Sequence, residues 1–331
     1  MSKFVVTGAC GFIGSALVRK LLSNDENEVL ALDKMGYASS IDFLGDAARS
    51  PKFSLIETDI STNEELITIF QKFIPDGIFH LAAETHVDKS IVDPKSFIFS
   101  NIVGTFKLLE AWRYYDQTNK KRFVHVSTDE VYGSLLQLDK PFTEESPYNP
   151  SSPYSASKAS SDHLVNAWNN TFGMNTIITN CSNNFGPCQS AEKLIPKVIH
   201  CIIKKERIPI FGNGKQIRDW LYVEDHVSAL ELAMSVGTSG STYAISSENT
   251  KTNLDLVEQI CKIYDQKYNS TKLSSKSLIS FVEDRPGHDV AYALSPRKTE
   301  TELGWRSAYN FENAIENTID WYVSMHNNPP K

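Results

Sequence analysis

The sequence lacks the features that would place the chain in a membrane, outside the cell or on nucleic acid. No apolar run approaches the roughly 18–20 residues of a membrane span. The net charge is −7 and no long basic run occurs, so nucleic acid is not an expected partner. The five cysteines are scattered and form no Cys-x-x-Cys pair, which favours reduced thiols over disulfides or a zinc site. The first residues do not resemble a signal peptide, so we expect a cytoplasmic protein without a bound metal.

Predicted strands and helices alternate along the first half of the chain. Apolar runs typical of buried strands lie at 3–7, 28–33, 53–57, 77–81 and 122–127. Helical spacing of apolar residues occurs at 12–22, 64–73 and 97–115. This order predicts an α/β fold, a Rossmann-type doubly wound parallel sheet with helices on both faces.

After about residue 180 the pattern loosens and prolines punctuate shorter elements. Helices are expected near 225–236, 254–268 and 311–325. We therefore predict a Rossmann domain over 1–180 and a smaller C-terminal α/β lobe over 181–331, with some segments of the lobe returning to the first domain.

A glycine-rich turn, Gly8-Ala9-Cys10-Gly11-Phe12-Ile13-Gly14, follows the first predicted strand and opens a helix. A pyrophosphate can approach backbone amides at a helix N-terminus only where no Cβ blocks it. Asp33 ends the next strand, where an acid accepts hydrogen bonds from ribose hydroxyls and repels a 2′-phosphate. The pattern predicts NAD rather than NADP, although the neighbouring Lys34 argues the other way. A purely structural turn is the alternative.

Further cofactor contacts are expected where the following strands end, because open α/β sheets bind ligands there. Asp59 and Ile60 follow the third strand and are candidates for the adenine. Leu81, Ala82 and Ala83 follow the fourth strand, where small side chains would let a cofactor lie across the sheet. Ordinary helix–sheet packing is a close competitor for Ala82 and Ala83.

Two acids, Asp129 and Glu130, follow Ser127 and Thr128 at the end of the strand predicted over 122–127. Adjacent carboxyls can act as an acid and a base when their environments separate their pKa values. Elimination of water needs such a division of roles. A helix N-terminus capped by Ser127 or Thr128 is the alternative interpretation.

Tyr-x-x-x-Lys pairs occur twice, at Tyr154/Lys158 and at Tyr268/Lys272, so the spacing alone carries little information. The first pair begins a helix after Pro153, and its i, i+4 spacing puts both side chains on one helical face. A lysine ammonium there would lower the tyrosine pKa from about 10. The phenolate could then take a proton from an alcohol as hydride leaves its carbon.

Together these motifs resemble the extended short-chain dehydrogenase/reductase superfamily, and within it the nucleotide-sugar 4,6-dehydratases of the dTDP-glucose type. The resemblance covers nearly the whole chain. It rests on the motifs above and on Val131-Tyr132-Gly133, Asn180-Cys181-Ser182-Asn183-Asn184, Glu192-Lys193-Leu194-Ile195-Pro196, Arg218-Asp219-Trp220-Leu221-Tyr222 and Asp284-Arg285-Pro286-Gly287-His288-Asp289.

The resemblance implies a tightly bound NAD that is recycled in each turnover. It also implies a role in a deoxysugar (rhamnose-type) pathway. By resemblance, Tyr154 is the base at the 4-hydroxyl, Lys158 tunes it and holds the nicotinamide ribose, and Thr128 holds the sugar. After oxidation at carbon 4, Glu130 takes the carbon-5 proton and Asp129 protonates the departing 6-hydroxyl. Hydride then returns to carbon 6, which gives the 4-keto-6-deoxyhexose.

The resemblance also implies the remaining contacts and a homodimer. Ser100 and Asn184 would join the cofactor set. The nucleotide-sugar contacts would be Thr85, His86, Thr128, Asn183, Lys193, Leu194, Pro209, Phe211, Arg218, Asn253, Arg285 and His288. Arg218 suits a pyrophosphate because its guanidinium binds two oxygens at once.

Departures from the family pattern leave the substrate open. Ala291 stands where the family usually has arginine, which could admit a different group, so UDP-glucose and UDP-GlcNAc remain alternatives to dTDP-glucose. A 4-epimerase of the same superfamily would share Tyr154 and Lys158 but would not need Asp129 and Glu130 together. A non-catalytic NAD sensor could lose the catalytic set.

Overall fold

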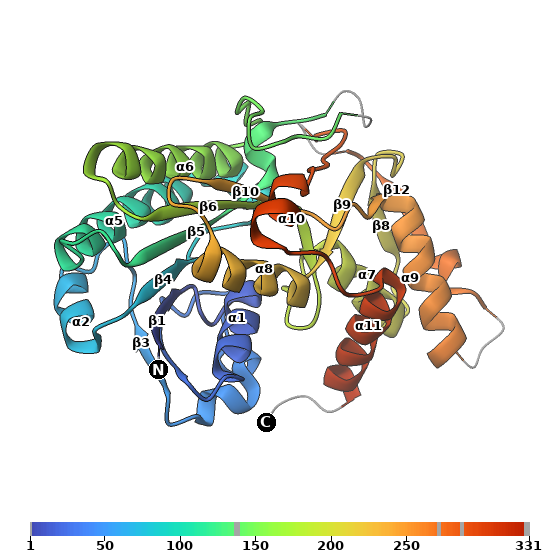
Figure 1. Ribbon diagram of the computed structural model, residues 1–331. Helices are drawn as coiled ribbons and strands as arrows, with labels where there is room; N and C mark the ends of the chain where they lie inside the picture. Colours follow the sequence, from blue (N-terminus) through green and yellow to red (C-terminus); the bar gives the residue numbers. More distant parts are fainter. Residues whose placement is uncertain (1, 136–139, 270–272, 285–287, 328–331) are drawn as a thin grey trace.

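A seven-stranded sheet forms the centre of the protein, in the order β10-β6-β5-β4-β1-β2-β3, with every neighbouring pair parallel (Figure 1). Its strands are β1 (Ser2–Thr7), β2 (Asn27–Asp33), β3 (Phe53–Glu57), β4 (Gly77–His80), β5 (Arg122–Thr128), β6 (Thr176–Cys181) and β10 (Thr242–Ile245). The computed structural model describes residues 2–135, 140–269, 273–284 and 288–327. The strand order confirms the doubly wound sheet predicted from the sequence.

Helices cover both faces of the sheet because neighbouring strand residues point to opposite sides. Val6 belongs to the apolar cluster under α1 (Phe12–Leu22) and α8 (Val223–Val236). Val5 belongs to the cluster under α2 (Leu66–Phe73), α5 (Gly104–Tyr115) and α6 (Pro153–Phe172). Strands buried on both faces read as continuous apolar runs, which is why the sequence revealed most of them.

The helix predicted over 97–115 is three elements instead of one. They are α4 (Pro94–Phe97), a π-helix η2 (Ile98–Val103) and α5. Hydrogen bonds of Asn101 hold this π-helix in place. Its amide accepts from Glu84 N at 2.8 Å and donates to Ser157 Oγ at 2.8 Å, so the β4 loop is tied to α6. Such π-helices are frequent at functional sites.

α6 carries the Tyr154/Lys158 pair and begins where the sequence places its signals. Ser152 and Ser155 form a reciprocal capping box, and Pro153 occupies the first turn. The helix ends at Gly173, whose φ of 69° is the left-handed conformation that favours glycine.

The second half of the chain adds two small sheets, in the orders β11-β9-β7 and β12-β8. Their strands are β7 (Asn183–Phe185), β8 (Ile208–Phe211), β9 (Ile217–Tyr222), β11 (Thr250–Thr252) and β12 (Ile279–Val282). The accompanying helices are α7 (Leu194–Lys204), α9 (Asn253–Tyr268), α10 (Arg297–Leu303) and α11 (Phe311–Asn327). β10 and α8 come from this half but belong to the central sheet and its cover.

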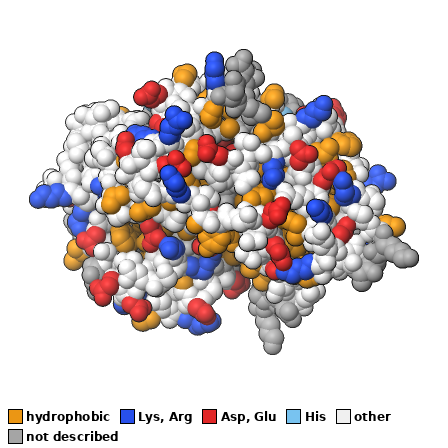
Figure 2. Space-filling view, turned by 45° about the vertical axis from the view of Figure 1, so that its right-hand side comes forward, with side chains coloured by type: hydrophobic (Ala, Val, Ile, Leu, Met, Phe, Trp, Pro, Cys, Tyr) orange, Lys and Arg blue, Asp and Glu red, His pale blue; other side chains and the backbone are white. Residues whose placement is uncertain are grey.

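Short helices fill the connections, namely η1 (Ile41–Arg49), α3 (Val87–Val92), η3 (Asp129–Tyr132) and η4 (Ser275–Leu278). Among the described residues, no helix has the length and apolar character to cross a membrane. The same part of the chain contains no cluster of three or more His, Cys, Asp or Glu side chains suited to a metal ion. Basic and acidic side chains are interspersed on the face shown in Figure 2.

Candidate active site

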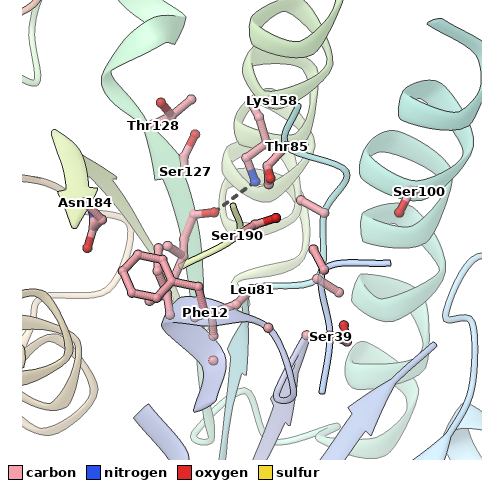
Figure 3. A pocket seen from close by; sticks show the side chains of 18 of the residues that line it. Phe12, Ser39, Leu81, Thr85, Ser100, Ser127, Thr128, Lys158, Asn184 and Ser190 are labelled. Atoms are coloured by element: carbon pink, nitrogen blue, oxygen red, sulfur yellow. Dashed lines mark hydrogen bonds between the residues drawn. The ribbon is translucent and has the colours of Figure 1, made fainter. Parts of the chain in front are cut away.

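A pocket opens at the carboxyl ends of the central strands, and every cofactor residue predicted from the sequence lines it (Figure 3). These residues are Gly8, Gly11, Phe12, Ile13, Gly14, Asp33, Lys34, Asp59, Ile60, Leu81, Ala82, Ala83, Ser100, Tyr154, Lys158 and Asn184. Thr128, Asp129 and Glu130 line it too. The pocket therefore joins the glycine-rich turn to the catalytic candidates in one space.

The glycine-rich turn is shaped by close backbone contacts. Gly8 has φ +67°, and a Cβ on it would lie 2.8 Å from Ala82 N. A Cβ on Gly14 would lie 2.0 Å from the carbonyl oxygen of Gly8. Both positions therefore require glycine, and at Gly8 the turn passes directly over the backbone of Ala82.

Asp33 braces this turn from the end of β2. Its carboxylate accepts hydrogen bonds from Cys10 N at 2.9 Å and from Met35 N at 2.8 Å. Lys34 turns to Glu84, with Nζ 2.5 Å from Oε1. The lysine that argued for a 2′-phosphate is thus paired with an acid.

Thr128, Asp129 and Glu130 form the start of a short helix, and all three also line the pocket. Thr128 Oγ1 accepts from Glu130 N and caps η3, as the alternative interpretation predicted. Asp129 is 1% exposed, and its Oδ2 has no hydrogen-bond partner within the described residues. Burial, and then the neighbouring Glu130 and Asp219, raise the pKa of Asp129 well above its ordinary value. Asp129 is thereby biased toward the protonated form, which can donate a proton.

Tyr154 and Lys158 lie on the buried face of α6. Lys158 Nζ donates to Val126 O on β5 at 2.9 Å, the bond dashed in Figure 3. The lowered pKa expected for Tyr154 is wrong for the protein alone. Burial, and then Glu130, raise the pKa of this phenol well above 10, because an anion is disfavoured away from water and beside another anion.

The second Tyr-x-x-x-Lys pair does not line this pocket. Tyr268 is half-exposed on α9 and donates to Asp320 Oδ1 on α11 at 2.7 Å. Lys272 lies outside the described residues.

The predicted substrate residues fall into two groups. Thr85, Thr128, Asn183 and Lys193 line the pocket. Lys193 Nζ donates to Thr85 O at 3.0 Å, which brings the chain before α7 against the β4 loop. His86 caps α3 beside Thr85, and Leu194 begins α7.

Pro209, Phe211, Arg218, Asn253 and His288 do not line this pocket and lie around the small sheets. Arg218 is 5% exposed, stacks over the Tyr292 ring at 4.3 Å and acts electrostatically on Asp129. Phe211 and His288 form a ring pair 6.5 Å apart. Arg285 lies outside the described residues.

Ala291 lies behind this region, not in the pocket. It is 3% exposed and packs in an apolar cluster with Leu135. Its carbonyl accepts from Leu135 N at 2.9 Å. The departure from the family pattern therefore lies at a buried apolar position next to Tyr292, not in the wall of the pocket.

The sequence reasoning missed several pocket residues, namely Leu32, Ala38, Ser39, Thr58, Val126, Cys181, Ser182, Gln189, Ser190 and Glu192. Most of those after residue 180 follow β6, a strand that was not predicted. The β-branched residues from Thr176 to Thr179 gave a weak strand signal, which the polar Asn180 interrupts. Gln189 Oε1 and Asn183 Oδ1 are buried without a partner in the described part of the chain, as expected of groups that bind a ligand.

The sheet order, the glycine-rich turn and the Tyr154/Lys158 pair define an extended short-chain dehydrogenase/reductase. Residues 5–318 match the family described as GDP-mannose 4,6 dehydratase. The chain is 47% identical to the dTDP-glucose 4,6-dehydratase of Salmonella typhimurium, over 97% of this chain and 93% of that protein. The chain belongs to this family of nucleotide-sugar 4,6-dehydratases.

Solved structures agree with that assignment. DesIV, the dTDP-glucose 4,6-dehydratase of Streptomyces venezuelae solved with NAD bound, superposes with a TM-score of 0.91 and 35% identity, over 98% of both chains. The UDP-glucose 4-epimerase of Thermotoga maritima gives a TM-score of 0.87 at 25% identity, over 98% of this chain and 99% of that one. The fold is thus shared with epimerases, and the site must separate the two reactions.

We predict that Asp129→Asn stabilises the protein increasingly as the pH rises. An unfolded aspartate ionises near pH 3.9, whereas burial raises the pKa of Asp129 in the folded chain, so the wild type loses stability as the pH rises through that interval. Asparagine removes this cost. Thermal unfolding of the NAD-saturated proteins at pH 5 and pH 8 should show a melting temperature higher by about 1–3 °C for the variant at pH 8 and a smaller difference at pH 5.

The matched control is Asp46→Asn, since the Asp46 side chain is 94% exposed. Its melting temperature should follow the wild type at both pH values. If the melting temperature of Asp129→Asn relative to wild type is lower at pH 8 than at pH 5, burial does not raise the pKa of Asp129.

Proposed function

We infer that this chain is an NAD-dependent nucleotide-diphosphate-hexose 4,6-dehydratase of the dTDP-glucose type. It converts the sugar nucleotide to the 4-keto-6-deoxy product with loss of water. The observation that carries this inference is the buried Asp129 beside Glu130, in the same pocket as Tyr154 and Lys158. A 4-epimerase oxidises and re-reduces carbon 4, for which a tyrosine base is enough. Elimination of water needs a further acid and a further base.

The pocket residues fit a dinucleotide. Gly8, Gly11 and Gly14 line the pocket at the start of α1, where backbone amides would hold a pyrophosphate. We assign Asp33 to the adenosine ribose, and the pairing of Lys34 with Glu84 supports NAD over NADP. When bound there, NAD would supply the hydride acceptor for carbon 4 and, once reduced, the hydride donor for carbon 6.

The protein side chains handle the protons. We assign Tyr154 to the 4-hydroxyl proton, with Lys158 offsetting the phenolate charge. A ketone at carbon 4 acidifies the carbon-5 proton, which Glu130 removes, and the protonated Asp129 donates to the departing 6-hydroxyl. The burial of Asp129 and Tyr154 excludes water, which protects the unsaturated intermediate from side reactions.

We assign the nucleotide end of the substrate to residues 181–331. Arg218 beside Asp129, with Arg285 and His288, would contact the diphosphate, and Phe211 and Pro209 would flank the base. Thr85, His86, Asn183, Lys193, Leu194 and Asn253 complete the proposed set. A cytoplasmic location and a role in deoxysugar (rhamnose-type) synthesis belong to the same proposal.

The decisive experiment is incubation of the purified protein with dTDP-glucose, UDP-glucose and UDP-GlcNAc. Products are identified by mass and NMR. We expect a loss of 18 mass units from dTDP-glucose, the mass of water, with net NAD unchanged because the cofactor is recycled. An isomer of unchanged mass would indicate an epimerase. Preferred turnover of either UDP sugar would reassign the substrate but keep the reaction.

Glu130→Gln and Asp129→Asn should separate oxidation from elimination. Each should lower formation of the 4-keto-6-deoxy product by about 10²–10⁴-fold, because a positioned acid or base contributes that much. Tyr154 and Lys158 remain, so both variants should still oxidise carbon 4, seen as NADH absorbance with dTDP-glucose. Glu145→Gln, at an exposed position, is the control and should match wild type. Unimpaired product formation by both active-site variants would exclude dehydration.

We further propose a homodimer through the face of α5 and α6. Phe106, Tyr114 and Phe172 are 44%, 54% and 40% exposed. Trp168 links Phe106 to Phe172 through ring contacts of 5.9 and 5.6 Å, and Arg113 stacks on both Phe172 and Tyr114. A connected exposed aromatic surface of this kind is typical of a protein interface.

Phe106→Glu should shift the protein from dimer to monomer, because a charge would be buried without a partner in the interface. Light scattering after size exclusion at micromolar concentration measures this. Val236→Glu, at a 57% exposed apolar residue at the end of α8, is the control and should remain dimeric. A monomeric wild type, or a dimeric Phe106→Glu, would place the interface elsewhere or remove it.

A further inference from the structure

A fully buried carboxylate lies one helical turn beyond Lys158 and has no part in the reaction described so far. Asp162 is 0% exposed and does not line the pocket. It follows Lys158 by four residues on α6, so the two side chains lie on the same helical face. A buried charge is costly unless partners satisfy it, so its surroundings indicate what it does.

Asp162 is held by donors from three other segments. Ser127 Oγ on β5 and the Tyr148 hydroxyl each donate to Oδ2 at 2.8 Å. Asn180 Nδ2 on β6 donates to the same oxygen at 3.4 Å, and His125 Nε2 lies 3.2 Å from Oδ1. Three donors therefore converge on one oxygen of this carboxylate.

The neighbouring histidine does not neutralise this anion. Burial, and then the charge of Lys158, lower the pKa of His125 to about 4, so the imidazole is uncharged near neutral pH. The positive charge that Asp162 balances is therefore that of Lys158.

β5 braces both groups through consecutive residues. The carbonyl of Val126 accepts from Lys158 Nζ, and the next residue, Ser127, donates to Asp162. Lysine and aspartate are thus fixed against one strand, at the point where it leads into Thr128 and the two acids. Displacing Asp162 would disturb the lysine and the strand that carries the acid–base pair.

Lys158 needs a counter-charge because its buried surroundings disfavour the positive charge of its ammonium group. It is 4% exposed, and burial lowers its pKa, whereas Asp162 and then Cys181 act in the opposite direction. The other titratable groups around it are Tyr154 on α6, Cys181 on β6, and His80 and His125 on β4 and β5. Burial raises the pKa of Cys181 to about 12 and lowers those of both histidines, so these three are neutral near pH 7.

We propose that Asp162 is a positioning residue that keeps Lys158 protonated and in place for proton transfer at Tyr154. The proposal rests on the proposed function, since it gives Lys158 its role. It explains how a lysine can remain cationic where almost no water reaches it. It also explains why a carboxylate that touches neither substrate nor cofactor is surrounded by four polar side chains.

The test is the pH profile of product formation from dTDP-glucose by the NAD-loaded proteins. In Asp162→Asn the alkaline limb should move to lower pH by about one to two units, because loss of a nearby opposite charge changes a pKa by roughly that much. Asp162→Glu keeps the charge and should restore most of the wild-type limb. Tyr148→Phe removes one donor but no charge, so its limb should not move.

The outcomes separate the two levels of inference. A wild type that makes no 4-keto product refutes the proposed function. A wild type that turns over while the limb of Asp162→Asn stays in place refutes the role of Asp162, even if the variant is slower or less stable. Should Asp162→Asn not fold, the wild-type profile decides. A buried lysine without a counter-charge would lose its proton at a low pH, so wild-type activity that falls below about pH 8 would overturn the proposal. Wild-type activity that continues above pH 8 supports the proposal.

Discussion

Burial of ionisable groups at the carboxyl end of β5 is the constraint on which the site depends. Asp129, Tyr154 and Lys158 are each less than a tenth exposed. A buried ionisable group gives up its charge unless something stabilises it. Asp129 has no described partner on Oδ2 and is pushed toward the acid form, whereas Lys158 has Val126 and the nearby Asp162. The same burial therefore favours the neutral form of Asp129, whereas we propose that Lys158 keeps its charge through Asp162.

The parallel sheet makes this arrangement possible because it gathers strand ends at one edge. The turn after β1, Asp33 after β2, Ala82 after β4 and Thr128 at the end of β5 are distant in sequence but line one pocket. Close backbone contact at Gly8 fixes where β1 and β4 meet. The dinucleotide cleft and the acid–base pair are thus consequences of one topology.

Local sequence patterns predicted the bounds of several strands and helices and the glycine-rich turn. Phe12–Leu22 and Phe53–Glu57 have the predicted bounds, and Gly8 and Gly14 proved to be sterically required. Three features could not be read from local pattern. The π-helix at Ile98–Val103 depends on Asn101 bridging to Glu84 and Ser157. The β6 run was hidden among polar residues. The raised pKa of Tyr154 depends on burial by segments far away in the sequence.

The structure also separates the chemistry from the choice of substrate. Asp129 and Glu130 sit on η3, directly after a central strand, so their positions are set by the sheet core. Arg218 and Phe211 sit on small peripheral sheets, with Ala291 packed behind them. Changes at the periphery can alter which nucleotide or sugar fits without moving the acid–base pair. Under the proposed assignment, the reaction therefore depends on the core, whereas the sugar nucleotide would be selected by residues around β8 and β9.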